Sequence, residues 1–218
     1  MTKTLIKFAL PGILAFSLNT ANAELFINPA EKLQNGASDV SLHFGTSDVD
    51  YDFDGVNADI ERTFFGGTYA FASSPKLDIF FTFSYTMEAE IENGPDDSGI
   101  MLGGGARFSI PNQRGLNLVG YGQLLLIDED YTSNVSGEET YILLGLSIST
   151  KLEQNFVVYG GPELNLYSDM DIEGVDGDRD DVLGFRVGAN YDAGDFLLNF
   201  NLALMHESGM FFSVSRLF

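Results

Sequence analysis

Residues 76–92 read KLDIFFTFSYTMEAEIE, and the large apolar residues of this stretch fall on every second position. One parity holds Leu77, Ile79, Phe81, Phe83, Tyr85, Met87 and Ala89, and the other holds Asp78, Phe80, Thr82, Ser84, Thr86, Glu88 and Glu90. A period of two places these sets on opposite faces of a β-strand. The stretch is long for a soluble strand and suits a tilted membrane strand that continues beyond the lipid.

The same alternation recurs along the chain, in residues 99–110, 139–150, 181–192 and 195–206. In each range one face is large and apolar, and the other is small, polar and rich in glycine. A soluble sandwich would turn the apolar face inward, whereas a transmembrane barrel turns it outward to lipid. The glycine-rich face suits a narrow lumen, so a barrel is favoured and a soluble exported β-protein is the alternative.

The pattern predicts an all-β fold, an antiparallel up-and-down transmembrane β-barrel of about ten strands. Their ranges are roughly 39–53, 59–73, 76–92, 99–110, 116–131, 139–150, 155–172, 181–192, 195–206 and 209–218. Connections such as SSPK and LEQN are short, whereas DFDGVNAD and DIEGVDGDRDD are longer, as expected for periplasmic turns and outer loops. An even count places both ends on the periplasmic side. Eight strands is the alternative, with one terminal hairpin misread.

The N-terminus divides the chain into three parts. Residues 1–23 hold two lysines, an apolar run and the small residues ANA, which predicts a secretory signal peptide. We expect residues 24–38 to form a periplasmic segment and residues 39–218 to form the barrel. The formal charge of −21 at pH 7 argues against a nucleic-acid partner, and the chain has no cysteine for disulfides.

The last residues, MFFSVSRLF, place Phe212, Val214 and Phe218 on one parity. This ending resembles the terminal strand of bacterial outer-membrane β-barrel proteins, in the broad class of small OmpA-like, opacity-type barrels. The resemblance implies an outer-membrane location, contact with lipid and lipopolysaccharide, a monomer, and recognition of the terminal aromatic by the barrel assembly machinery. Arg216 departs from the hydrophobic residue usual at its position, and at the periplasmic interface its long side chain could snorkel.

Residues 48–61, DVDYDFDGVNADIE, match the letters of an EF-hand calcium loop. An EF-hand needs flanking helices, but both flanks here have strand patterns, so we reject that interpretation. Acids also alternate near the ends of the other outward-running strands, which predicts rows of carboxylates at the outer rim. Such rows keep a barrel soluble above the lipid, and they could also bind a divalent cation such as Ca²⁺. The candidate ligands are Asp50, Asp52, Asp54, Asp169, Asp171 and Glu173.

Isolated charges on the lumen parity predict an internal network of ion pairs. Its expected members are Asp78, Glu88, Arg107, Glu163, Arg186 and Asp192. Unpaired charges in a narrow lumen are costly, so we expect a salt-bridged plug, with a charged constriction that selects small solutes as the alternative.

The sequence favours a barrel without catalytic activity, in a structural or surface-interaction role, with no cofactor beyond the possible Ca²⁺. A narrow, cation-preferring pore for small solutes is the second hypothesis. An outer-membrane lipid-modifying enzyme is the third. His206 and Ser208 resemble the His-x-Ser of lipid A deacylases, but no acid follows Ser208. An outer-membrane protease is less favoured, because the chain is much shorter than that family.

Overall fold

A computed structural model describes residues 26–30, 33–91, 97–111, 116–132, 135–179, 182–204 and 208–218. The predicted signal peptide lies outside these ranges. Among the described residues, no helix is long and apolar enough to cross a bilayer. The strands are β1 (Ser38–Phe53), β2 (Val56–Ser74), β3 (Leu77–Ile91), β4 (Asp97–Ser109), β5 (Asn117–Thr132), β6 (Val135–Glu153), β7 (Phe156–Ile172), β8 (Val175–Arg179), β9 (Leu183–Asp192), β10 (Leu197–Leu204) and β11 (Ser208–Leu217).

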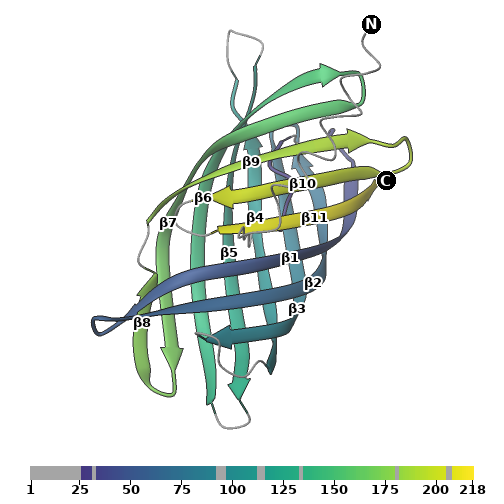
Figure 1. Cartoon of the computed structure of the whole chain (residues 1–218). Helices are drawn as coiled ribbons and strands as arrows, with labels where there is room; N and C mark the ends of the chain where they lie inside the picture. The colour runs from purple at the N-terminus through teal and green to yellow at the C-terminus, as the bar shows by residue number, and fades with distance from the viewer. Residues whose placement is uncertain are drawn as a thin grey trace, which may run out of the picture.

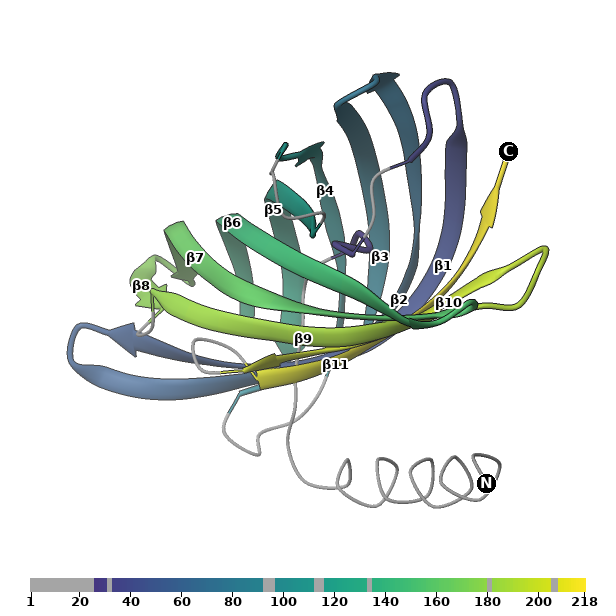
Figure 2. The same cartoon turned by 90° about the horizontal axis from the view of Figure 1, so that it is seen from above.

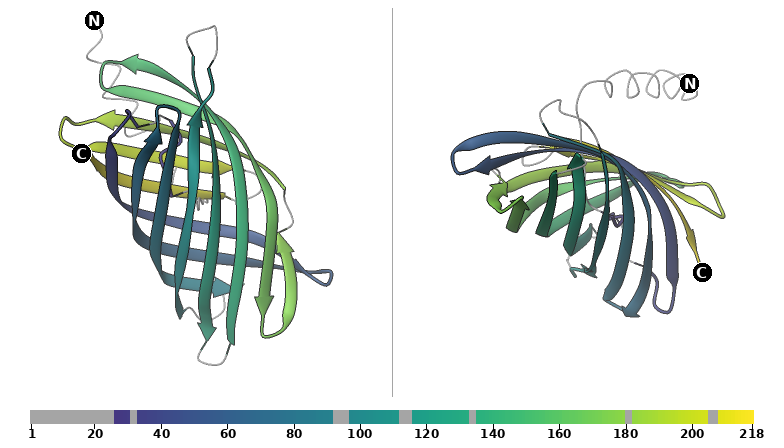
Figure 3. Two further views of the ribbon diagram at one scale, coloured as in Figure 1. Left: turned by 180° about the vertical axis from the view of Figure 1, so that it is seen from behind. Right: turned by 90° about the horizontal axis from the view of Figure 1, so that it is seen from below.

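The strands form one closed antiparallel ring, shown from opposite sides in Figure 1 and Figure 3. Each long strand pairs with its chain neighbours, and β11 returns to pair with β1 from Asp39–Leu217 to Asp48–Ser208. The backbones of Ser38 and Phe218 exchange hydrogen bonds of 3.0 and 2.8 Å at the seam. Ten of the strands make the ring, and β8 pairs with two of them, β7 and β1, at the outer end. The predicted up-and-down barrel is confirmed, and the eight-stranded alternative is wrong.

The outer end of the barrel, opposite Ser38 and Phe218, has fewer strands than the ring below it. Strands β9, β10 and β11 have only 10, 8 and 10 residues, whereas β1 and β7 have 16 and 17. Strand β8 fills the place beyond the outer ends of these three strands, because it pairs with β7 on one side and with Tyr51 and Asp52 of β1 on the other (Figure 1). The wall therefore narrows from ten strands to eight. The sequence pattern did not predict β8, which was assigned to a loop.

Two outer connections are tight turns, so the prediction of long loops there is wrong. Asp54 and Gly55 have φ of 55° and 87°, and Glu173 and Gly174 have φ of 54° and 81°. Positive φ at both central residues defines the type I′ hairpin turn. The DFDG sequence that resembles a calcium loop therefore forms a two-residue hairpin, and its flanking strands extend beyond the membrane region.

The large apolar side chains cover the outside of the ring, as the alternation predicted. Phe81, Phe83, Leu102, Leu124 and Leu126 are 44–58% exposed. A transmembrane barrel places such residues against acyl chains. Near its outer end, β3 has a register shift between Thr86 and Ala89, which exposes Glu88 and buries Ala89.

The interior holds more aromatic side chains than the expected small polar lumen would. Phe64, Phe80 and Phe211 are fully buried inside the ring, in one apolar cluster with Met101 and Leu125. Several lumen glycines provide the space, because a Cβ at Gly45 would collide with the Phe64 ring and one at Gly145 with the Tyr121 ring. The glycine-rich face thus accommodates rings instead of leaving an open channel.

Candidate functional site

Four charged side chains form a buried cluster across the narrow outer part of the lumen. Arg62 Nε lies 2.7 Å from Glu129 Oε2, and Arg62 Nη2 lies 3.2 Å from Glu139 Oε2. Arg179 of β8 reaches the other oxygen of Glu139, with Nε 2.7 Å from Oε1. All four side chains are fully buried. We call Arg62, Glu129, Glu139 and Arg179 the outer cluster.

Neighbouring hydroxyl groups and rings complete the outer cluster. Tyr51 donates a 2.6 Å hydrogen bond to Glu139, and Thr86 donates one of 2.8 Å to Glu129. The guanidinium of Arg179 lies 3.8 Å from the centroid of the Tyr141 ring, within cation–π range. Burial by itself would raise the pKa of Glu139, but Arg179 and Arg62 outweigh it and hold this pKa below its ordinary value.

The outer cluster lies above the apolar belt. On the same stretches of strand, the outward-facing neighbours Glu61, Asp128, Asp130 and Glu138 are exposed acids. Sequence reasoning missed the cluster, because β5 is apolar on both parities and its facing could not be assigned. The available signal was the polar Gln123, which shares its parity with Glu129 and marks this face of β5 as the lumen face.

Two further ion pairs lie in the periplasmic half of the lumen, and both join predicted residues. Arg107 Nε is 2.7 Å from Asp78 Oδ2, and Arg186 Nε is 2.7 Å from Glu163 Oε1. Tyr121 also donates to Glu163 Oε1, at 2.6 Å. These four charged residues are at most 2% exposed.

The other two predicted network members lie elsewhere. Glu88 is exposed, because the register shift in β3 reverses the facing of the strand before that residue. Asp192 is exposed at the turn after β9, where it accepts a hydrogen bond from the Gly194 backbone. Neither of them contributes to the buried pairs.

Residues 26–30 and 33 occupy the lumen near its periplasmic end, and we call them the plug. The wall holds the plug mainly by side chains that bond to its backbone. Phe26 N donates to Gln123, Thr68 donates to Phe26 O, and Leu33 N donates to Asp78, at 2.7–3.1 Å. Arg107 donates to Asn28 O, and Asn117 and Ser149 both donate to Ala30 O. In Figure 2 the plug is the start of the purple part of the chain, and it lies inside the curve of the strands.

Phe26 is the apolar anchor of the plug and is 1% exposed. Its ring centroid lies 4.8, 5.3 and 6.2 Å from those of His43, Phe64 and Phe211. The plug thereby joins the aromatic cluster of the wall. Below the outer cluster the lumen is filled by rings, by two ion pairs and by this segment.

The six predicted metal ligands do not form one group. Asp50 lies with Asp48 and Asp59, whose candidate ligand atoms all fall within 4.8 Å of one another. Asp52, Asp54 and Asp169 border a pocket of about 610 Å³, together with Asp176, Asp178 and Arg179. Burial, together with the charges of Glu61 and Asp59, raises the pKa of Asp48, which shows how crowded the carboxylates are.

Several of the same acids have a role within their turns. Asp52 accepts a hydrogen bond from Gly55 N, and Asp171 accepts one of 2.9 Å from Gly174 N. Glu173 accepts one of 3.2 Å from Ser136 N. These contacts explain aspartate and glutamate at the hairpins without a metal, so Ca²⁺ binding at the rim stays a prediction.

The last strand presents Phe212 and Val214 on the outer face, with Phe212 44% and Phe218 67% exposed. Arg216 lies 5.4 Å from the centroid of the Phe218 ring. Of the two residues on which the lipid-hydrolase hypothesis rests, His206 lies outside the described residues and Ser208 is the first residue of β11.

No protein-family model matches the sequence, and no curated protein is significantly similar to it. Solved structures do match the fold. The COG4313 outer membrane channel from Pseudomonas putida F1 aligns with a TM-score of 0.56 at 12% identity, covering 89% of this chain and 100% of that one. The outer membrane protease OmpT from Escherichia coli gives 0.46 at 13%, covering 86% and 98%. OprG from Pseudomonas aeruginosa gives 0.40 at 11%, covering 87% and 99%.

The COG4313 channel is a bacterial outer-membrane protein, and the exposed apolar belt of this chain fits the same location. The predicted outer-membrane β-barrel fold is therefore confirmed. At 12% identity this likeness shows the fold alone, and the fold by itself does not select a function.

Proposed function

We propose that this chain is a non-catalytic outer-membrane barrel with a sealed lumen, whose acidic outer hairpins make its contacts at the cell surface. The outer cluster carries the proposal. Its four charged side chains are fully buried where only eight strands enclose the lumen. A barrel of about this size is normally filled by side chains, whereas porins need about sixteen strands.

A narrow pore for small cations is the second candidate. One observation favours it: the lumen wall formed by β6, β7, β9 and β10 is polar, with Ser147, Glu163, Asn190 and Asn201 buried along it. The structural match to a channel fits this candidate equally well. An open pore would require the side chains of the outer cluster to move apart. That movement would break their ion pairs and leave buried charges without partners, which is unfavourable.

Conductance across planar bilayers separates the two candidates. We expect the purified full chain to give no steady current steps. An Arg62→Ala, Arg179→Ala, Phe26→Ala triple variant should give flickering steps, because it removes both cations of the outer cluster and the aromatic anchor of the plug. The matched control is Arg216→Ala, which changes an exposed arginine and should stay silent. Steady cation-selective steps from the unaltered protein would reject the seal in favour of the pore.

The C-terminal strand supports a further part of the proposal, namely recognition by the barrel assembly machinery. Phe218 is 67% exposed although it belongs to the strand that closes the ring, so its ring is available to a partner. Phe218→Ala should lower the amount of folded barrel in the outer membrane severalfold, whereas Phe196→Ala, in an exposed turn, should not. Equal yields would remove this role. We further propose a monomer in contact with lipid and lipopolysaccharide.

A further inference from the structure

Three buried polar atoms on neighbouring strands have no hydrogen-bond partner within the described part of the chain. They are Ser147 Oγ of β6, and Glu163 Oε2 and Asn165 Oδ1 of β7. The three residues are 2%, 1% and 6% exposed. A buried polar group without a partner is unfavourable, and in folded proteins such groups are usually satisfied by bound water or an ion.

These atoms share one wall of the lumen, and that wall is polar along its length. Asn190 and Asn199 are linked by a 2.6 Å hydrogen bond, and Asn199 also donates to the Tyr159 hydroxyl at 2.8 Å. Gly161, which lies against Ser147, places no side chain in front of it. The opposite wall carries the buried rings of Phe64, Phe80 and Phe211, so the two sides of the lumen differ in chemistry.

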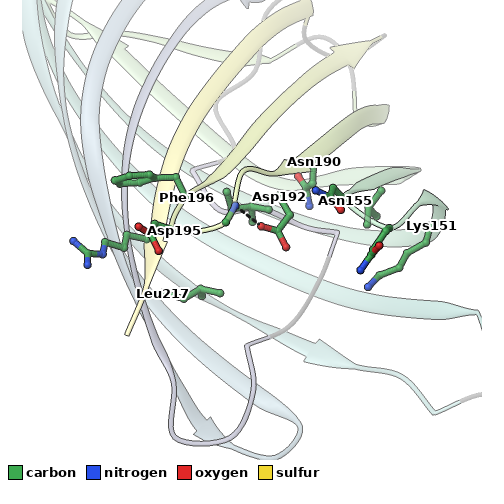
Figure 4. A pocket seen from close by; sticks show the side chains of 12 residues that line it. Lys151, Asn155, Asn190, Asp192, Asp195, Phe196 and Leu217 are labelled. Carbon is green, nitrogen blue, oxygen red and sulfur yellow. Dashed lines mark hydrogen bonds between the residues drawn. The ribbon is translucent and has the colours of Figure 1, made fainter. Parts of the chain in front are cut away.

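The polar wall begins at a pocket of about 330 Å³ on the periplasmic rim. Lys151, Asn155 and Asn190, from β6, the β6–β7 turn and β9, lie close together there (Figure 4). Lys151 has the parity of the lumen-facing Ser147 and Ser149, and the buried lumen residue Asn190 also lines the pocket, so the pocket borders the lumen. Ser147 lies four residues farther along the same strand face, roughly 13 Å from Lys151.

We propose that this wall forms an inlet for water and for monovalent cations about as large as a water molecule. The inlet runs from the rim pocket past Asn28 and Ala30 of the plug to Glu163 and Asn165. Glu163 Oε2 and Asn165 Oδ1 are acceptors, so they take hydrogen-bond donors or cations and not anions. The inlet ends below the outer cluster. It is compatible with a sealed barrel and with a pore, so it does not rest on the proposed function.

The absence of cysteine from the sequence allows a direct test with single-cysteine variants. The probe is Ag⁺, a thiol reagent small enough for such a path, added as the nitrate to folded protein in chloride-free micelles. Ser147→Cys reports the inlet. Thr82→Cys is the matched control, because Thr82 is 5% exposed, lies on the same face of β3 as the buried ring of Phe80, and bonds to the Thr68 hydroxyl. Unreacted thiol is counted after unfolding, and heat-modifiable gel mobility confirms that each variant is folded.

We expect Ser147→Cys to react at least tenfold faster than Thr82→Cys, and Lys151→Trp at the rim to slow the first rate without changing the second. Asn165→Cys serves as the reporter if Ser147→Cys does not fold. Equal rates on the two walls would overturn the inlet, as would a fast Ser147→Cys reaction unaffected by Lys151→Trp. Conductance is a separate measurement, so silent bilayers with fast labelling mean an inlet below an intact seal.

Discussion

The two ends of this barrel are closed by different means. At the outer end the strands themselves supply the closure, through charged side chains that pair across an eight-stranded wall. At the periplasmic end a separate segment fills the lumen, held by one aromatic anchor and by side chains that bond to its backbone. The outer cluster is part of the strands, so the outer end can open only if the barrel itself loses stability. The plug can leave the lumen locally while the ring of strands stays folded.

The largest expected effect comes from breaking the outer cluster. Arg62→Ala removes the ion-pair partner of Glu129 and one of the two ion-pair partners of Glu139, which leaves the buried Glu129 carboxylate without a countercharge. We expect a loss of about 3–5 kcal/mol in the free energy of unfolding. Urea unfolding of the barrel in micelles measures it. Arg216→Ala, at an exposed site, should change stability by less than about 0.5 kcal/mol. Similar values for both variants would mean that the cluster does not hold the outer wall.

A second substitution tests whether the plug can be lost from the lumen without unfolding the ring of strands. Phe26→Ala should remove about 3 kcal/mol of packing from the plug. We expect faster proteolytic cleavage within residues 26–33 and almost no change in the unfolding midpoint of the ring. The matched control is Phe211→Ala, which removes a ring from the same cluster but on strand β11. It should lower the midpoint itself. If Phe26→Ala lowered the midpoint as far as Phe211→Ala, the plug would be part of the global fold.

Lowering the pH should change the stability of the folded barrel through two carboxylates at its outer end, and the two effects have opposite signs. The pKa of Glu139 is lowered in the folded protein, so its contribution to stability is present above the ordinary value of 4.5 and is lost as the pH falls below it. The pKa of Asp48 is raised, so its ionisation weakens the fold as the pH rises above the ordinary value of 3.8.

Thermal unfolding between pH 3 and pH 8 checks both signs. Glu139→Gln should flatten the loss of stability in acid, and Asp48→Asn should flatten the loss toward neutral pH. Identical pH profiles for the two variants would contradict this assignment of the two carboxylates.

The smallest effect concerns the acidic rim. Exposed like charges repel, so Ca²⁺ should raise the thermal midpoint slightly, with half of the effect near 10⁻⁴–10⁻³ M, the range of weak extracellular sites. The Asp50→Asn, Asp52→Asn double variant should lose most of the Ca²⁺ response. Asp97→Asn, at another outer hairpin, is the control. An unchanged response would remove Asp50 and Asp52 as ligands.

Much of the fold could be predicted from the sequence, since the side chains of a strand alternate strictly. Phe81 and Phe83 point to lipid, and the alternation predicts Asp78, Arg107, Glu163 and Arg186 as lumen charges without fixing which of them pair. Prediction failed where this rule is interrupted. The register shift in β3 moves Glu88 to the outside, and nothing in the letters around Thr86 marks it. The sequence predicts a loop where the short strand β8 lies, since five residues are too few for the alternation to mark a strand.

By itself, the sequence determined that this chain forms strands with one face for lipid and one for the lumen, because the period of two depends only on local geometry. The tertiary structure decided what fills the lumen. Arg62, Glu129, Glu139 and Arg179 come from β2, β5, β6 and β8, and Phe26 meets His43, Phe64 and Phe211 only after the ring has closed. Which side chains meet across a barrel depends on the stagger of all its strands, and that stagger is a property of the closed ring.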